Sequence, residues 1–313
     1  MLAECMKQAL TKALALALLS TGRSVALSQQ PAPEVAFTFD DLPAHGPLSP
    51  GMARPEPVRE ILAALKAEQM PPTYGFVNGF RLVKWPYQRH ILQAWVRSGN
   101  PVGNHTWSHP ELDKTSAQKY EADIARDEPT LRQVAPHGDW HWFRYPYLEE
   151  GETLAKREAV RGWLLRYHYR IAEVNIDFED YMWNDTYGRC ADQHNSAAVQ
   201  SLHDSYLATA DEYITYSRSL SHSLYGRDIP YVLLLHVGAF DAKMLRELIA
   251  LYRKRGFQFV TLPQAEADPV YSTDPAIAYP GGGLMMELQA AKRNVVLPTG
   301  ASEPEAELDK MCR

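Results

Sequence analysis

The stretch VAFTFDDLPAHG, residues 35–46, joins an apolar run to two adjacent carboxylates, Asp40 and Asp41. Its first five residues are rich in aromatic and β-branched side chains, which favour a buried strand. Two like charges at the end of such a strand are costly unless a cation or hydrogen bonds compensate for them. The stretch therefore predicts a buried strand that ends at a charged site. The alternative is a solvent-exposed turn before Pro43 that carries no chemistry.

Six further stretches with strand character recur along the chain, separated by stretches with helical periodicity. This alternation predicts an α/β fold with a parallel sheet. The expected strands cover residues 35–39, 73–77, 101–105, 142–145, 171–176, 231–236 and 257–262. The expected helices lie within residues 57–69, 88–99, 116–134, 150–167 and 241–256.

Two segments depart from the alternation. Residues 183–227 are polar, aromatic-rich and partly helical in pattern, and they predict a long crossover before the strand at 231–236. Residues 268–313 carry prolines, glycines and charges, so they are expected to form a peripheral C-terminal tail with one short helix near 284–293.

The N-terminus has the features of an export signal. Lys7 and Lys12 precede a short apolar run, and small residues at Ala26 and Ser28 offer a cleavage site. The apolar run is too short to span a membrane. The expected organisation is a signal peptide over residues 1–28, a linker over 29–34, a catalytic domain over 35–267 and the tail over 268–313, in an exported (periplasmic or secreted) protein.

Composition limits the partners of the protein. The 313 residues carry a net charge of −6, so neither nucleic acid nor an anionic membrane surface is an expected partner. Of the three cysteines, Cys5 would leave with the signal, and Cys190 and Cys312 would remain in an oxidising compartment. The sequence leaves open whether these two pair, and it does not indicate an oligomeric state.

Side chains suited to catalysis follow several of the expected strands. Asp40 and Asp41 follow the first strand, and one such residue also lies at each of three later strand ends, namely His105, Arg144 and His236. The carboxyl ends of parallel strands meet at one edge of a sheet or barrel, which is where sites are built. We therefore expect these side chains to converge.

The stretch GNHTWSHP places His105 and His109 four residues apart, so a tight turn brings both imidazoles to the same side. Pro110 disfavours helical geometry at His109. Two imidazoles and one carboxylate make a three-ligand site for Zn²⁺, with an open position for water, and Co²⁺ or another divalent ion fits the same ligands. The alternative is a pair of surface histidines.

Taken together, these residues resemble the motifs of the polysaccharide deacetylases of the NodB-homology type, carbohydrate esterase family 4. The motifs are TFDD at residues 38–41, HTWSH at 105–109, RYPY at 144–147 and LLLH at 233–236. The resemblance covers roughly residues 35–262 and implies a distorted (β/α) barrel of the NodB-homology (glycoside hydrolase/deacetylase) type.

The chain departs from the family pattern at two places. Asp177 and Asp180 keep the spacing of the fourth motif, but Tyr181 stands where tryptophan is usual, and Trp183 is expected to fill the same space. Leu148 replaces the usual glycine after the third motif. These departures concern the sugar-facing groove more than the chemistry.

The resemblance also implies roles at the reacting centre. Asp40 would be the general base, held ionised and oriented by Arg144. Asp41 would ligate the metal with His105 and His109.

Four further residues would act on the leaving group and on the substrate. His236 would be the general acid, and Asp180 would orient it. The backbone N–H of Tyr147 would stabilise the oxyanion, and Leu234 would line the pocket for the acetyl methyl group. His45 lies close enough to line the cleft, but a loop histidine is more often a hydrogen-bonded structural residue.

The implied function is a metal-dependent deacetylase that acts on N-acetylated sugars in peptidoglycan, chitin-like polymers or exopolysaccharide. A metal-bound water would attack the acetyl carbonyl. Three alternatives stay open, namely an O-acetyl esterase acting on acetylated xylan, a hydrolase of small amides, and a non-catalytic carbohydrate-binding protein.

Overall fold

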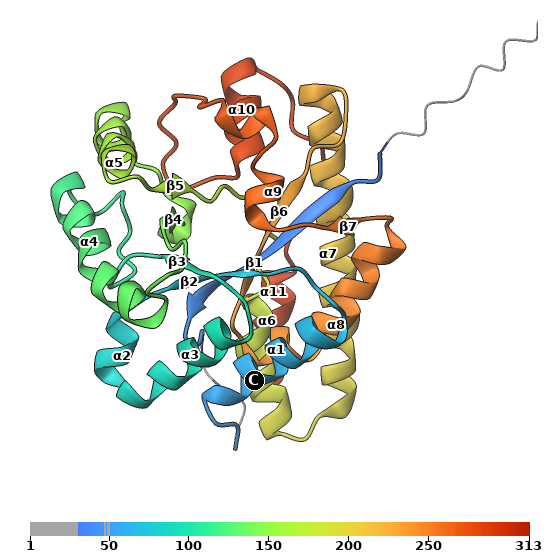
Figure 1. Cartoon of the computed structure of the whole chain (residues 1–313). Helices are drawn as coiled ribbons and strands as arrows, with labels where there is room; N and C mark the ends of the chain where they lie inside the picture. Colours follow the sequence, from blue (N-terminus) through green and yellow to red (C-terminus); the bar gives the residue numbers. More distant parts are fainter. Residues whose placement is uncertain (1–30, 47, 49–50) are drawn as a thin grey trace, which may run out of the picture. The chain divides into compact units, whose positions relative to one another are not determined.

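A seven-stranded parallel sheet lies at the centre of the structure, a computed structural model that describes residues 31–46, 48 and 51–313 (Figure 1). The expected signal peptide, residues 1–28, lies outside these residues. The strands are β1 (Glu34–Leu42), β2 (Tyr74–Val77), β3 (Val102–Asn104), β4 (Trp142–Phe143), β5 (Arg170–Ile171), β6 (Tyr231–His236) and β7 (Gln258–Phe259). Every one of them overlaps a strand expected from the sequence.

The strands follow the order β5-β4-β3-β2-β1-β6, and β7 pairs with the first residues of β1. Beyond β5 the chain continues to Ile176, which forms a parallel bridge with Leu233 in β6. The backbone N–H of Leu234 donates to the carbonyl oxygen of Ile176 at 3.0 Å. The bridge joins the two ends of the strand order, which makes the sheet the distorted barrel that the family resemblance implies.

Helices surround the sheet (Figure 1). They are α1 (Pro55–Ala67), α2 (Phe80–Lys84), α3 (Arg89–Arg97), α4 (Ala117–Val134), α5 (Leu154–Arg166), α6 (Met182–Asp192), α7 (Ser196–Tyr225), α8 (Ala239–Lys254), α9 (Leu262–Ala265), α10 (Met285–Arg293) and α11 (Glu305–Leu308), with short 3₁₀ turns η1 (Pro86–Gln88), η2 (Pro146–Leu148) and η3 (Pro269–Ser272). The crossover expected at 183–227 consists of α6 and α7. Within the described part of the chain, no helix is both long and apolar enough to cross a membrane.

The central strands are buried on both faces. All residues of β1 after Glu34 are buried, and in β6 His236 alone is partly exposed. A strand without a solvent face needs an apolar residue at nearly every position, which explains the continuous apolar runs VAFTF and YVLLL. The polar residues that follow these runs therefore lie at the carboxyl edge of the barrel.

The C-terminal segment is not the peripheral tail expected from its composition. Met285, Met286 and Ala290 of α10 and Leu308 of α11 belong to the main hydrophobic core. The N–H of Met285 donates to the carbonyl oxygen of Val174 at 3.0 Å. Prolines and glycines lie in the loops that join the helices of this segment, while its few apolar residues pack against the main core.

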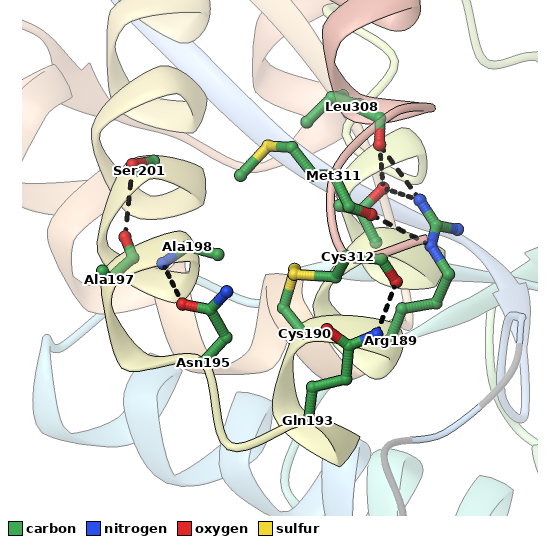
Figure 2. The surroundings of a disulfide bond; sticks show 11 residues. Arg189, Cys190, Gln193, Asn195, Ala197, Ala198, Ser201, Leu308, Met311 and Cys312 are labelled. Carbon is green, nitrogen blue, oxygen red and sulfur yellow. Dashed lines mark hydrogen bonds between the residues drawn. A yellow bond between two sulfur atoms is a disulfide. The ribbon is translucent and has the colours of Figure 1, made fainter.

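A disulfide holds the end of the chain against α6. Cys190 and Cys312 are bonded, with their Cα atoms 5.1 Å apart (Figure 2). Around the bond, Gln193 Nε2 donates to the carbonyl oxygen of Cys312 at 2.9 Å, and Arg189 Nη2 donates to that of Leu308 at 3.0 Å. The sequence left this pairing open, and the structure shows it formed.

Replacing Cys312 by serine is expected to lower the free energy of unfolding by about 2–5 kcal/mol. The disulfide joins residues separated by 122 positions, and closing so long a loop restricts the unfolded chain strongly. Urea unfolding of the oxidised wild type and the variant measures the difference. Reduced wild type is the matched control and should unfold like the variant, whereas equal stability of the oxidised wild type and the variant would contradict the assignment.

Candidate metal centre and catalytic cleft

Asp40 and Asp41 reach the same cleft because the strand is irregular where they lie. In a regular strand, successive side chains point to opposite faces. Asp41 instead has a φ of 65°, and the pairing of β1 with β2 shifts register between Phe39 and Leu42. A left-handed residue at such an irregularity turns the strand end, so both buried carboxylates line one cleft.

Asp41 lies beside the two histidines of the second motif. Its Oδ1 atom is 3.9 Å from His105 Nε2 and 3.6 Å from His109 Nε2. His109 follows β3 in a turn rather than a helix, with a φ of 57°, and its N–H donates to Thr106 Oγ1 at 3.0 Å. This turn brings the two imidazole rings to within 4.8 Å of each other, measured between centroids.

The donor set fits a divalent metal. Asp41 Oδ1 is buried and lacks a hydrogen-bond partner among the described residues, although it faces two ring nitrogens. His105 Nδ1 donates to the carbonyl oxygen of Arg144 at 2.8 Å, which leaves the Nε2 lone pair directed at the carboxylate. Burial lowers the pKa of His105, and burial together with His105 lowers the pKa of His109 to about 3. Both imidazoles are therefore neutral, the form that binds metal.

The other carboxylate oxygen of Asp41, Oδ2, is held by His45 and Arg81 and not by His105 or His109. His45 Nδ1 donates to Asp41 Oδ2 at 2.6 Å, and Arg81 Nη2 lies 3.1 Å from the same atom. Burial alone would raise the pKa of Asp41, but the hydrogen bond from His45 and the charge of Arg81 hold it well below its usual range. These contacts leave Oδ1 as the free oxygen of the carboxylate.

Asp40 is paired with Arg144, and both are almost fully buried. Arg144 Nη1 lies 3.2 Å from Oδ1 and 3.4 Å from Oδ2 of Asp40. Arg144 contacts Asp40 through Nη1 alone, because its Nη2 donates to Thr38 Oγ1 and its Nε donates to the carbonyl oxygen of Ala172. The guanidinium is thus fixed by three partners while it neutralises Asp40.

His236, at the end of β6, is fixed by Asp180. Its Nδ1 lies 2.6 Å from Asp180 Oδ1, and its backbone N–H donates to Asp180 Oδ2 at 2.6 Å. Asp180 has no exposed surface, whereas the His236 ring lines the cleft. Because Nδ1 donates to the carboxylate, Nε2 is the ring nitrogen left for chemistry.

Of the three residues expected to contact the substrate, Leu234 and Tyr147 line the cleft and Trp183 does not. Leu234 lines it and packs with Val174, Leu284 and Leu148 in a small apolar cluster. Tyr147 has a φ of 57° and lies in a turn at the cleft wall, with its ring centroid 4.6 Å from that of His109.

Trp183 does not face the cleft, which corrects the expectation from the sequence. Its side chain is fully buried, and its indole N–H donates to Ser205 Oγ at 2.9 Å. Tyr181 lines the cleft instead and lies 5.2 Å from the His236 ring, measured between centroids. Helix α6 begins at Met182, so positions 181 and 183 point to different sides of the first turn.

The cleft has a volume of about 650 Å³, and the C-terminal segment forms one wall. A Cβ atom at Gly282, where φ is 78°, would lie 2.2 Å from the carbonyl oxygen of Tyr147, so only glycine fits there. The sequence did not reveal this wall, nor the contact of Arg81. The wall residues from this segment are Gly281, Gly282, Gly283, Leu284, Glu287 and Glu303.

Known proteins resemble this chain in sequence and in fold. Residues 28–163 match the family described as polysaccharide deacetylase. The chain is 29% identical over 231 residues to a peptidoglycan-N-acetylglucosamine deacetylase of Bacillus cereus, covering 74% of this chain and 67% of that protein. It is 29% identical over 125 residues to a chitooligosaccharide deacetylase of Sinorhizobium fredii, covering 40% of this chain and 52% of that protein.

Among solved structures, a CE4 family pseudoenzyme from Bacillus anthracis has a similar fold. Its TM-score is 0.53 at 14% sequence identity, with 76% of this chain and 66% of that chain covered. At this level of identity, the likeness concerns the fold alone.

Proposed function

Because the chain contains a polysaccharide deacetylase domain, we propose that it is a zinc-dependent hydrolase of carbon–nitrogen bonds that removes acetyl groups from N-acetylated sugars. One observation carries this proposal. The unpartnered Oδ1 of Asp41 faces two neutral imidazoles, and a second carboxylate, Asp40, lies 3.7 Å from His105 Nε2. A metal position with a base beside it suits hydrolysis of an acetyl group.

The side chains that line the cleft divide the chemistry between a metal position, a general base and a general acid. Asp41, His105 and His109 would hold a divalent ion, and that ion would supply Lewis-acid chemistry for the acetyl carbonyl and for a water. Asp40 accepts the proton of the attacking water, and Arg144 holds the Asp40 carboxylate in place for this step. His236 donates a proton from Nε2 to the leaving amine, while Asp180 holds the ring through Nδ1.

The acetyl group has a matching pocket. Leu234, Leu284 and Leu148 line the same cleft as the metal position and offer an apolar contact for the methyl group. The turn at Tyr147 lies beside His109 in the wall of the cleft. The backbone N–H of Tyr147 would stabilise the oxyanion there. Leu148, which departs from the family pattern, thus takes part in the pocket.

A non-catalytic carbohydrate-binding protein is the less suitable alternative. Such a protein has no need for a buried arginine that neutralises a carboxylate, or for a histidine fixed through both Nδ1 and its backbone N–H. Burying these charged groups is energetically unfavourable, and such groups are typical of catalytic sites.

Acetate release by the zinc-reconstituted protein tests the proposed reaction. We expect release from N-acetylated chitooligomers, and a slower reaction with acetylated xylan and with small acetanilides. Release from acetylated xylan alone would make the protein an ester hydrolase, and release from acetanilides alone would make it a small-amide hydrolase.

The charge of the cleft predicts a preference among N-acetylated sugars. Glu179, Glu287 and Glu303 line it, and among the described lining residues the one lysine or arginine is Arg81, which is paired with Asp41. We expect kcat/KM for an oligomer of N-acetylmuramic acid, which carries a carboxylate, to be at least about tenfold below that for the neutral N-acetylglucosamine oligomer.

Kinetics with the two oligomers at low and high salt measure this preference. Glu303→Gln should reduce the difference in kcat/KM between the two oligomers. Added salt should also reduce it, because salt screens the repulsion between the acidic cleft and the substrate carboxylate. Equal kcat/KM values at low salt would contradict the electrostatic preference without affecting the proposed reaction.

We also propose that the protein works in an oxidising compartment outside the cytoplasm. The disulfide between Cys190 and Cys312 supports this, since disulfides are rare in reducing compartments. Fractionation of cells that produce the full chain tests the location.

A further inference from the structure

A second buried carboxyl group lies behind the pair formed by His236 and Asp180. Asp241, in the first turn of α8, is 2% exposed and is hydrogen-bonded to Asp180. Asn184 Nδ2 donates to Asp241 Oδ2 at 2.7 Å, and the Tyr206 hydroxyl donates to Asp241 Oδ1 at 3.2 Å. The two carboxyl groups therefore share one hydrogen bond in a region without solvent.

One of the two carboxyl groups must carry a proton, because two adjacent buried carboxylates cannot both be ionised. Asp180 accepts two short hydrogen bonds from His236, which favour its charged form. Asp241 receives hydrogen bonds from the neutral groups of Asn184 and Tyr206. Burial raises the pKa of Asp180 to about 7, and burial together with the charge of Asp180 raises the pKa of Asp241 well above its usual range. The hydrogen bonds and the directions of the two pKa shifts both favour a proton on Asp241.

We propose that Asp241 is a positioning residue for the general acid, and that its neutral carboxyl group donates a hydrogen bond to Asp180 and holds it, ionised, against His236. This inference rests on the proposed function, in which His236 protonates the leaving amine. The neutral carboxyl group of Asp241, the carboxylate of Asp180 and the imidazole of His236 then form a hydrogen-bonded series that runs from α8 to the cleft.

The surroundings fix Asp241 in this orientation. A Cβ atom at Gly238 would lie 2.3 Å from Asp241 Oδ2, so the turn before α8 packs closely against the carboxyl group. Asn184 is itself fixed, because its Oδ1 accepts the backbone N–H of Phe240 at 2.7 Å. Among the described residues, the other titratable groups that face Asp241, Asp180 and His236 are His45, Asp177, Glu179, Tyr181 and Tyr206.

The substitutions Asp241→Asn and Asp241→Ala test whether position 241 acts as a neutral hydrogen-bond donor, because Asn keeps such a donor and Ala removes it. An asparagine amide can donate to Asp180, and the Tyr206 hydroxyl can accept as well as donate, so Asn leaves no buried group unpaired. We expect Asp241→Asn to keep kcat within about threefold of the wild type. We expect Asp241→Ala to lower kcat about 10- to 100-fold with KM unchanged, and to move the alkaline limb of the pH profile to lower pH.

A difference infrared spectrum at pH 7 tests the position of the proton without reference to activity. The spectrum of the wild type minus that of Asp241→Asn should contain the carbonyl band of one protonated carboxyl group. Loss of carboxylate bands instead would show that Asp241 is ionised and would overturn the proposal. This measurement also decides the matter if Asp241→Ala fails to fold.

The kinetic outcomes are equally decisive. If Asp241→Asn shifts the alkaline limb as far as Asp241→Ala does, or if neither variant shifts it, Asp241 does not act through Asp180. If the wild type releases no acetate from any substrate, the proposed function fails, while the infrared result still reports the state of Asp241.

Discussion

Asp40→Asn is expected to lower the rate of acetate release about 10³-fold and to leave zinc bound. The expected loss follows from the role of Asp40 as the proton acceptor for the attacking water, since general bases contribute about 10²- to 10⁴-fold. An asparagine side chain has nearly the same shape and can still accept from Arg144 Nη1, but it cannot take up the proton. The effect should therefore appear in kcat, with little change in KM or in thermal stability.

The control for this variant is Asp185→Asn, the same substitution at an exposed position of α6. It should keep wild-type kinetics. Zinc content measured by atomic emission separates loss of the base from loss of the metal. An Asp40→Asn protein with kcat within tenfold of the wild type would assign the base to another residue.

His105→Ala is expected to remove both zinc and activity. The imidazole is buried, its Nδ1 is held by the Arg144 carbonyl oxygen, and its Nε2 faces Asp41 Oδ1. Without it, two ligands remain, and a site of two ligands binds zinc far more weakly than a site of three. We expect less than about one thousandth of the wild-type rate at equimolar zinc, since the Lewis acid is worth several kcal/mol.

His203→Ala provides the matched control, because His203 is a surface histidine on α7 that contacts Asp204 and Glu247, away from the cleft. It should keep one zinc per chain and full activity. Calorimetric zinc titration gives the affinity independently of turnover. A His105→Ala protein that still binds one zinc with wild-type affinity would contradict the ligand assignment.

The sequence was informative where burial leaves few choices. Strands β1 and β6 are covered on both faces, so each shows a run that is apolar except at Thr38 and that ends in a polar residue. Because parallel strands end at one edge, those polar residues could be expected to meet, and the structure brings Asp41, His105 and His109 together. Their roles in catalysis stay predictions that the variants above test.

The sequence was less informative where tertiary packing decides the outcome. Trp183 and Tyr181 are two positions apart, and which of them faces the cleft depends on where α6 begins. Arg81 follows β2 in a short helix, and no local pattern links it to Asp41. The wall formed by residues 281–284 depends on the packing of α10 against the core, which a segment rich in glycine and proline does not indicate.

Titration of the metal-free protein with zinc, with acetate release from an N-acetylglucosamine oligomer as the readout, tests whether deacetylation depends on a metal held by Asp41, His105 and His109. We expect the chelated protein to be inactive and the rate of acetate release to rise to a plateau at one zinc per chain. Acetate release by the fully chelated protein at the rate of the reconstituted one would contradict this dependence on the metal.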